Sequence, residues 1–216
     1  MTAPGAHRPP IVLASASPRR RELLAALDVP FVVRPANVDE TPPAGLDPAG
    51  VALAIARRKA AAASASAGGQ LVLAADTVVA LEGCLLGKPA DAAEARAMLE
   101  RLSGRTHDVY TAIVLVLDDQ RCEAVPLTRV SMRQLSASEI AASIAAGTPF
   151  DKAGGYAIQD PLLAPVARWE GCYCNVVGLP LWSTWQCLRT LLPDATPRPP
   201  DTAFERCAAC PLRQRI

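Results

Sequence analysis

Aromatic residues are scarce in this chain: three Phe, three Trp and three Tyr make up 4% of its 216 residues. Proteins that bind single-stranded nucleic acids need aromatic rings on which bases stack, and nucleic-acid binders in general carry basic patches and a high isoelectric point. The formal net charge here is +1. The low aromatic content and the near-neutral net charge both argue against a nucleic-acid partner. Basic runs at residues 19–21 and 57–59 keep that alternative open.

Long apolar runs are missing as well. No stretch approaches the ~20 consecutive apolar residues that cross a bilayer, and residues 1–10 lack the apolar centre of a secretory signal. The seven cysteines are odd in number and scattered without a regular framework, which is typical of reduced thiols in the cytosol. We therefore expect a soluble cytoplasmic protein with no membrane partner.

Half of the residues are hydrophobic, which is enough to bury the core of one domain, in one or two lobes. We expect this domain at residues 11–192, after a flexible N-terminus at residues 1–10. Residues 193–216 are rich in proline, and this composition predicts a disordered tail.

The tail carries a Cys-x-x-Cys pair. Cys207 and Cys210 could supply half of a zinc site, and Cys172 and Cys174, or a second tail, could supply the other two ligands that a complete site needs. The four residues lack the spacing of a zinc motif, so that incidental thiols in solvent are the simpler interpretation.

A strand, a turn and a helix are predicted at the start of the domain. Residues 11–13 are a short apolar run, and residues 22–27 have helical spacing. Ser17 is a good N-cap, and Pro18 suits the first helical position. The next three residues, 19–21, are all arginine, which is the wrong charge for a helix N-terminus. A bound phosphate would offset that penalty; the alternative is a capped helix with solvated arginines.

A carboxylate also interrupts an apolar region. Residues 71–75 and 78–81 are continuous apolar stretches, typical of a strand covered on both faces, and Asp76 lies between them. A carboxylate is costly to bury there unless it is paired, bound to a metal or functional. A structural aspartate fits the pattern equally well. A hairpin turn at residues 82–83 would bring Lys88 back toward Asp76.

The other elements alternate between helix and strand patterns. We expect strands at 31–33, 84–86, 106–117, 121–135 and 168–177, and helices at 48–67, 91–102, 136–146 and 181–192. Lys59, in the first of these helices, can point either to solvent or inward. Residues 151–159 place two glycines among charged and amide side chains, as in a loop whose backbone approaches a ligand or in a plain turn.

Six short motifs, taken in order, resemble those of the Maf family of nucleoside triphosphate pyrophosphatases, which is named for septum-formation inhibition. The motifs are LASASPRR at 13–20, ADT at 75–77, GKP at 87–89, SGRTH at 103–107, DKAGGYAIQ at 151–159 and NVVGLP at 175–180. Each motif is weak alone, whereas the ordered set is highly specific and covers about residues 11–192.

The resemblance implies an α/β fold with an elongated mixed β-sheet, surrounding helices and two lobes around a substrate cleft, an architecture shared with the inosine triphosphate pyrophosphatases. It implies that a nucleoside triphosphate and water give the monophosphate and pyrophosphate, with Mg²⁺ or Mn²⁺ as cofactor. It also suggests a homodimer, for which the residues themselves give no argument.

The resemblance assigns roles to individual residues. Asp76 matches the family's catalytic acid/base, which activates the attacking water, and it would also bind the metal. Glu40 matches an acidic position and is the second metal-binding candidate. The implied substrate-binding residues are Ser15, Arg19, Arg20, Lys59, Thr77, Lys88 and Gln159. Phosphoryl transfer depends mostly on positioning and charge stabilisation, so that a cluster of donors suits it.

Three positions separate branches of the family. Arg19, Thr77 and Gln159 match the dTTP/UTP pyrophosphatases, whereas the branch acting on 7-methyl-GTP typically has tryptophan at the first position. A glutamine amide can meet the imide edge of a pyrimidine, which offers both donor and acceptor groups. We therefore predict hydrolysis of dTTP and UTP, with modified pyrimidine nucleotides as further substrates. A 7-methyl-GTP pyrophosphatase and a nucleotide-binding regulator of septum formation are the alternatives.

The chain departs from the family pattern in two places. Residues 160–163, Asp-Pro-Leu-Leu, replace the usual glycine and small-residue turn after Gln159, where the rim of the base pocket is expected. The Pro-rich tail extends past the usual end of the domain. The first departure bears on the choice of substrate, and the second bears on chemistry only if the tail binds a metal or covers the cleft.

Overall fold

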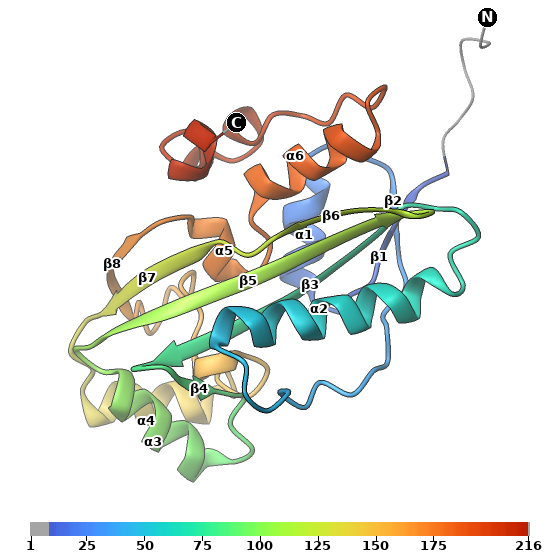
Figure 1. The fold of residues 1–216 in the computed structure, drawn as a ribbon. Helices are drawn as coiled ribbons and strands as arrows, with labels where there is room; N and C mark the ends of the chain where they lie inside the picture. The colour runs from blue at the N-terminus through green and yellow to red at the C-terminus, as the bar shows by residue number, and fades with distance from the viewer. Residues whose placement is uncertain (1–8, 216) are drawn as a thin grey trace, which may run out of the picture.

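A computed structural model describes residues 9–215, and its centre is an eight-stranded mixed β-sheet (Figure 1). The strand order is β2–β1–β3–β5–β7–β8, with β4 paired to β3 and β6 paired to β5. Strands β1, β2 and β3 are parallel and all other pairs are antiparallel. The α/β class and the mixed sheet are thus confirmed. Residues 1–8, for which we expected flexibility, lie outside the described residues.

The strands are β1 (Ile11–Leu13), β2 (Phe31–Val33), β3 (Val72–Leu81), β4 (Cys84–Leu86), β5 (Thr106–Leu117), β6 (Gln120–Ala124), β7 (Leu127–Met132) and β8 (Val166–Glu170). The α-helices are α1 (Pro18–Ala25), α2 (Pro48–Ser64), α3 (Ala92–Leu102), α4 (Ala137–Ala145), α5 (Tyr173–Val177), α6 (Leu181–Leu191) and α7 (Pro200–Ala203). Short 3-10 turns are Ala153–Gly155, Glu205–Cys207 and Pro211–Arg215.

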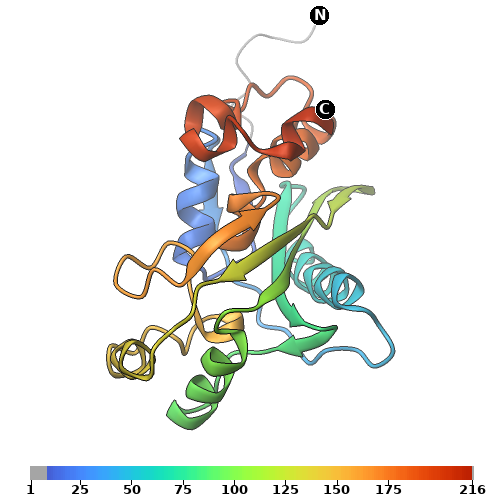
Figure 2. The ribbon, with the colours of Figure 1, turned by 90° about the vertical axis from the view of Figure 1, so that its left-hand side faces the viewer.

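The alternating side chains of β3 and β5 divide the core between the two faces of the sheet. Val72 and Ala74 pack with the alanine-rich face of α2, and Leu73 and Ala75 pack with α1 and α6 on the opposite face (Figures 1 and 2). Small alanine side chains let α2 lie close to the strands. Helices α3 and α4 cover a third cluster at one end of the sheet. The apolar run at 71–75 is therefore covered on both faces, as predicted.

Two expected strands are broken. The strand expected at 121–135 is two strands, β6 and β7, with Pro126 in the gap, where its missing N–H cannot join a ladder. The strand expected at 168–177 ends at Glu170, and α5 follows. Gly171 causes this break, because its φ is +124° and a Cβ there would lie 2.9 Å from the Leu127 carbonyl oxygen.

The Pro-rich tail differs from the expectation of disorder. It forms α7 and two 3-10 turns beside α6, and its apolar residues Phe204 and Leu212 pack against the cluster around α1 and α6 (Figure 1). The Arg198 N–H donates to the Leu27 carbonyl at 2.7 Å. Composition favoured disorder, but a few apolar residues in the tail find a complementary surface on the domain.

The cysteines also differ from the expectation that all are reduced. Cys122 on β6 and Cys187 on α6 form a disulfide, with their Cα atoms 5.5 Å apart, and the other five cysteines are free. The pairing arises because α6 packs directly on the β6 side of the sheet. Within residues 9–215, no helix combines the length and apolarity needed to cross a bilayer.

Candidate functional site

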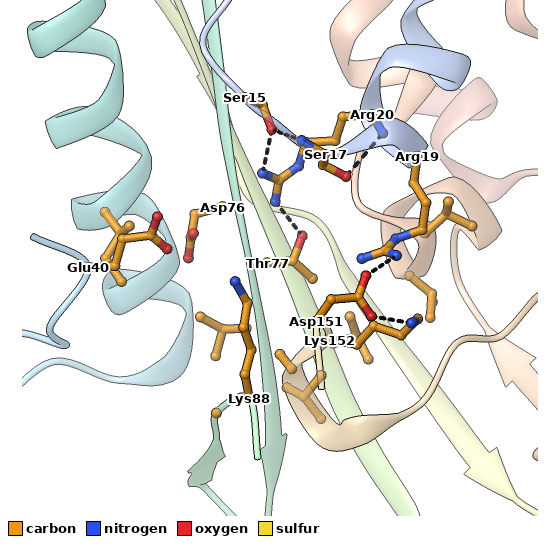
Figure 3. Close-up of a pocket in the computed structure, with 18 of the residues that line it drawn as sticks. Ser15, Ser17, Arg19, Arg20, Glu40, Asp76, Thr77, Lys88, Asp151 and Lys152 are labelled. Atoms are coloured by element: carbon orange, nitrogen blue, oxygen red, sulfur yellow. Dashed lines mark hydrogen bonds and ion pairs between the residues drawn. The ribbon is translucent and has the colours of Figure 1, made fainter. Parts of the chain in front are cut away.

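A cleft of about 970 Å³ opens where β1 ends beside the longer strand β3 (Figure 3). The last pair between these strands is Leu13 with Leu73, and the residues of β3 that line the cleft, 76–79, lie beyond this pair. The cleft is lined by the turn after β1, by α2, by the middle of β3, by the segment after β4, by residues 151–159 and by the end of α5.

All of the residues that the sequence nominated line this single cleft: Ser15, Arg19, Arg20, Glu40, Lys59, Asp76, Thr77, Lys88 and Gln159. Lys88 and Gln159 are exposed at its edge. In Figure 3 the Lys88 amine points toward the space between Asp76 and Thr77. The β3–β4 hairpin therefore returns Lys88 toward Asp76, as its turn signal indicated.

Arg20 is held in place by three acceptors from three segments. Its Nη1 donates to Ser15 Oγ at 3.2 Å, its Nη2 to Thr77 Oγ1 at 3.1 Å and its Nε to the Gly178 carbonyl at 2.9 Å. Ser17 caps α1 by accepting from the Arg20 N–H at 3.4 Å. Burial lowers the pKa of Arg20, and Asp76 and Glu40 act against this shift. The N-terminus of α1 thus presents a fixed cation to the cleft.

Arg19 joins α1 to the loop at 151–159. Its Nη1 lies 2.9 Å from Asp151 Oδ2, and Asp151 also pairs with Lys152. Burial would raise the pKa of Asp151, but hydrogen bonds from Lys152 and Arg19 hold it below its usual value. Asp151 and Lys152 line the cleft, although they were not among the nominated site residues. Their signal was the charged pair immediately before two glycines.

Asp76 and Lys59 form a buried ion pair on the opposite wall. Lys59 Nζ lies 2.8 Å from Asp76 Oδ1 and 3.0 Å from Glu40 Oε2. The side chains of Lys59 and Asp76 are 8% and 10% exposed, whereas that of Glu40 is 51% exposed. Lys59 therefore points inward from α2, which the sequence could not decide. Figure 3 shows the Asp76 and Glu40 carboxylates facing each other.

Burial raises the pKa of Asp76 above its ordinary value, although Lys59 and Arg20 pull it down and Glu40 adds to the rise. A carboxylate with a raised pKa is a stronger proton acceptor than an aspartate in solvent, and such groups are concentrated at catalytic sites. The arrangement can therefore take a proton from a water molecule bound in the cleft.

A network of hydrogen bonds supports the floor of the cleft from behind. Thr77 Oγ1 lies 2.9 Å from Thr111 Oγ1. Asn175 Oδ1 accepts from the Thr111 N–H at 2.9 Å, and Asn175 Nδ2 donates to the Val109 carbonyl at 2.9 Å. Thr111 and Asn175 are completely buried. Asn175 was expected within a strand, so that this supporting role was not foreseen.

The donors of the cleft fit a Mg²⁺ ion. Mg²⁺ in nucleotide sites is held by one or two carboxylates together with substrate phosphate oxygens and water, and Asp76 and Glu40 supply two carboxylates at one wall. Among residues 9–215, no group of three or more His, Cys, Asp or Glu side chains stands ready to hold a metal ion by itself. An ion here would therefore depend on oxygens from the substrate.

The fold and the cleft together define an α/β protein with one cleft in which arginines and lysines surround a buried carboxylate. The family model described as Maf-like protein matches residues 10–191. The chain belongs to this Maf-like family.

Relatives with high identity cover most of the chain. A dTTP/UTP pyrophosphatase of Thermomicrobium roseum is 53% identical over 208 residues, which are 94% of this chain and 93% of the relative. A dTTP/UTP pyrophosphatase of Salinibacter ruber is 50% identical, covering 86% of this chain and 92% of the relative. Another, of Myxococcus xanthus, is 53% identical, covering 81% and 88% respectively.

Among solved structures, a HAM1 protein from Coxiella burnetii matches with a TM-score of 0.39 and 22% identity. The match covers 56% of this chain and 72% of that protein. At this level of similarity it carries no argument about function.

Proposed function

We propose that this protein hydrolyses nucleoside triphosphates, with dTTP and UTP preferred, to the monophosphate and pyrophosphate. The observation that carries the proposal is the buried Asp76–Lys59 pair in a cleft that also presents Arg19, Arg20 and Lys88. Relatives named dTTP/UTP pyrophosphatase, about half identical over most of the chain, support the same activity.

Asp76 is the general base of the proposed reaction. Its carboxylate takes a proton from water as the water oxygen attacks phosphorus, and the α–β anhydride bond breaks so that pyrophosphate leaves. Lys59 holds the carboxylate at 2.8 Å and keeps its charged form available. The raised pKa of Asp76 strengthens it as a base.

The basic residues bind the triphosphate. The Arg20 guanidinium is fixed by its three acceptors, and together with Arg19 and Lys88 it stabilises the charge that develops on the phosphate oxygens. The N–H groups at the start of α1 face the same anion, which offsets the unfavourable placement of arginines at a helix N-terminus. Ser15 and Thr77 act through Arg20 by fixing its orientation.

Asp76 and Glu40 are the residues that would hold Mg²⁺ or Mn²⁺ in the presence of substrate. A divalent ion held there would neutralise phosphate charge and polarise the phosphorus under attack. Gln159 is proposed to read the pyrimidine, because its amide can both donate to and accept from the imide edge. We further propose a cytoplasmic location, where triphosphates are abundant, and a homodimer, which analytical ultracentrifugation would test.

Pyrophosphate release from a panel of dTTP, UTP, CTP, GTP and 7-methyl-GTP with Mg²⁺ or Mn²⁺ tests the substrate. Preference for dTTP and UTP is the expected result. Preference for 7-methyl-GTP would contradict the specificity drawn from Arg19, Thr77 and Gln159. Binding of nucleotides without turnover of any of them would favour the regulatory alternative.

The Asp76→Asn variant tests the base. We expect kcat to fall by about 10²–10⁴-fold, the usual contribution of a general base. The circular dichroism spectrum should stay native, although the loss of the buried Asp76–Lys59 ion pair lowers the melting temperature. Asp119→Asn is the matched control, because Asp119 is an exposed aspartate in the turn between β5 and β6. Near-normal turnover of Asp76→Asn would end the assignment.

A further inference from the structure

Four cysteine thiols from two distant segments meet in the interior of the protein. Cys172 and Cys174 stand at the start of α5, and Cys207 and Cys210 belong to the Pro-rich tail. Their exposed fractions are 1%, 1%, 1% and 5% in that order. The interpretation of the tail cysteines as incidental thiols in solvent is therefore wrong.

All four cysteines belong to one buried cluster. Within it, Cys174 Sγ lies 3.5 Å from Cys207 Sγ, so that a thiol of α5 contacts a thiol of the tail. Cys172 and Cys210 are buried in the same cluster.

The backbone that carries the thiols is fixed from behind. Thr128 Oγ1 accepts from the Cys172 N–H and donates to the Cys172 carbonyl, both at 3.0 Å. Trp182 Nε1 donates to the Cys207 carbonyl at 2.9 Å. Metal ligands need this kind of second layer to hold their orientation.

The spacing between sulfur atoms suits a shared metal better than a covalent bond. In a tetrahedral zinc site with Zn–S bonds of about 2.3 Å, the sulfur atoms are about 3.8 Å apart. The 3.5 Å between Cys174 and Cys207 is close to this value, whereas the disulfide between Cys122 and Cys187 has 2.07 Å between its sulfur atoms.

The four thiols do not surround a common centre in this structure. Among the described residues, no three His, Cys, Asp or Glu side chains are already placed to hold one ion. The thiols would have to turn from one another toward a common centre. A cysteine does so by rotation about its single χ1 bond, and metal binding offsets the cost of that rotation.

We propose that Cys172, Cys174, Cys207 and Cys210 bind a structural Zn²⁺ ion that fastens the tail to α5. Binding converts the thiols to thiolates and releases their protons to solvent. Four sulfur ligands leave the ion no open position, so that its role is to hold the structure rather than to perform chemistry. This site is independent of the proposed pyrophosphatase activity.

The zinc site would also stiffen the back of the cleft. Helix α5 leads directly into Gly178, whose carbonyl accepts from Arg20 Nε at 2.9 Å. Fastening α5 to the tail restricts the motion of that carbonyl, and hence of Arg20, without placing the metal near the substrate.

Elemental analysis of the full chain, purified without chelators or metal-affinity resin, tests the proposal without any substrate. We expect about one zinc ion per chain, as for a closed tetrahedral site. The Cys207→Ser/Cys210→Ser variant should lose the zinc, and the melting temperature of the wild-type protein should fall after a chelator removes it. Cys84→Ser is the matched control, because Cys84 is free and exposed, and this variant should keep its zinc.

Thiol counting and intact mass on the wild-type protein keep the test valid if the double variant fails to fold. Zinc released in proportion to thiols blocked by a mercurial supports the site. Metal-free protein in which all five free thiols titrate would overturn the proposal. Iron in place of zinc would overturn it, and so would a mass about 2 Da lower for each disulfide formed within the cluster.

Discussion

Arg20 uses all three nitrogens of its guanidinium group on acceptors from three separate segments, the turn after β1, strand β3 and the loop after α5. The planar fork of arginine matches these three directions at once, and its charge persists despite burial. The side chain therefore connects the two walls of the cleft as well as presenting a cation to it. Its shape as much as its charge determines its role.

Arg20→Lys tests this double role. A lysine keeps the charge but cannot satisfy three acceptors in fixed directions. We expect kcat/KM for dTTP to fall by about 10²-fold, in line with the loss of one preorganised donor. Arg21→Lys, next in the same helix and exposed, should leave kcat/KM unchanged. Equal kinetics for the two variants would show that charge alone matters at position 20.

Lys59 sets the protonation of Asp76. Burial and Glu40 raise the pKa of Asp76, and Lys59 lowers it. In Lys59→Met the lowering influence is lost, so that the pKa of Asp76 rises further. Since a base must be deprotonated to act, the acidic limb of the pH profile of kcat/KM should move to higher pH.

Arg57→Met is the control for Lys59→Met. Arg57 lies on the same helix and pairs with Glu123 at 2.6 Å, away from Asp76. Its pH profile should match that of the wild type. An acidic limb that stays in place in Lys59→Met would show that Lys59 does not act on the titrating group.

At the scale of elements, the five-residue helix α5 contacts several parts of the structure. It follows the break at Gly171, fixes strand β5 through Asn175, leads to the carbonyl that holds Arg20 and begins with two of the clustered thiols. The break after β8 makes these contacts possible, because a strand continuing from β8 would place its side chains alternately on the two faces of the sheet.

Asn175→Leu tests α5 as the support of the cleft. The substitution leaves the Thr111 N–H and the Val109 carbonyl buried without their partner. Each such loss costs about 1–3 kcal/mol, so that we expect the free energy of unfolding to fall by about 3 kcal/mol or more in denaturant titration. Asn37→Leu, at an exposed asparagine, is the control. A similar small effect in both variants would contradict the supporting role.

At the scale of the whole molecule, the sheet is covered on two faces and at one end, and the tail completes the cover over α6. Two tryptophans of α6 donate hydrogen bonds to the tail. Trp182 Nε1 donates to the Cys207 carbonyl at 2.9 Å, and Trp185 Nε1 donates to the Pro197 carbonyl at 3.0 Å. The tail is therefore part of the folded domain rather than an appendage.

Truncation after residue 192 tests this view. Removal of the tail exposes the apolar surface around α6 and leaves two indole N–H groups without protein acceptors. We expect a lower melting temperature, and Phe204→Ala should give a smaller shift in the same direction, because Phe204 packs against the same cluster. An unchanged melting temperature after truncation would restore the expectation of a disordered tail.

Local sequence patterns were enough to predict many of the helices and strands. Apolar runs gave β1 and β3, the Ser17–Pro18 pair marked the start of α1, and the Ser136–Glu139 capping box marked the start of α4. Ordered motifs indicated the family and nominated residues that all line one cleft. These features depend on neighbours in the chain, which a sequence displays directly.

Contacts between distant segments were decided by the tertiary structure alone. The direction of Lys59, the pairing of Arg19 with Asp151, the disulfide between Cys122 and Cys187 and the docking of the tail all join residues far apart in the chain. Such contacts depend on which helix covers which face of the sheet. The sequence by itself determined which chemical groups are present, and tertiary packing determined which of these groups are in contact.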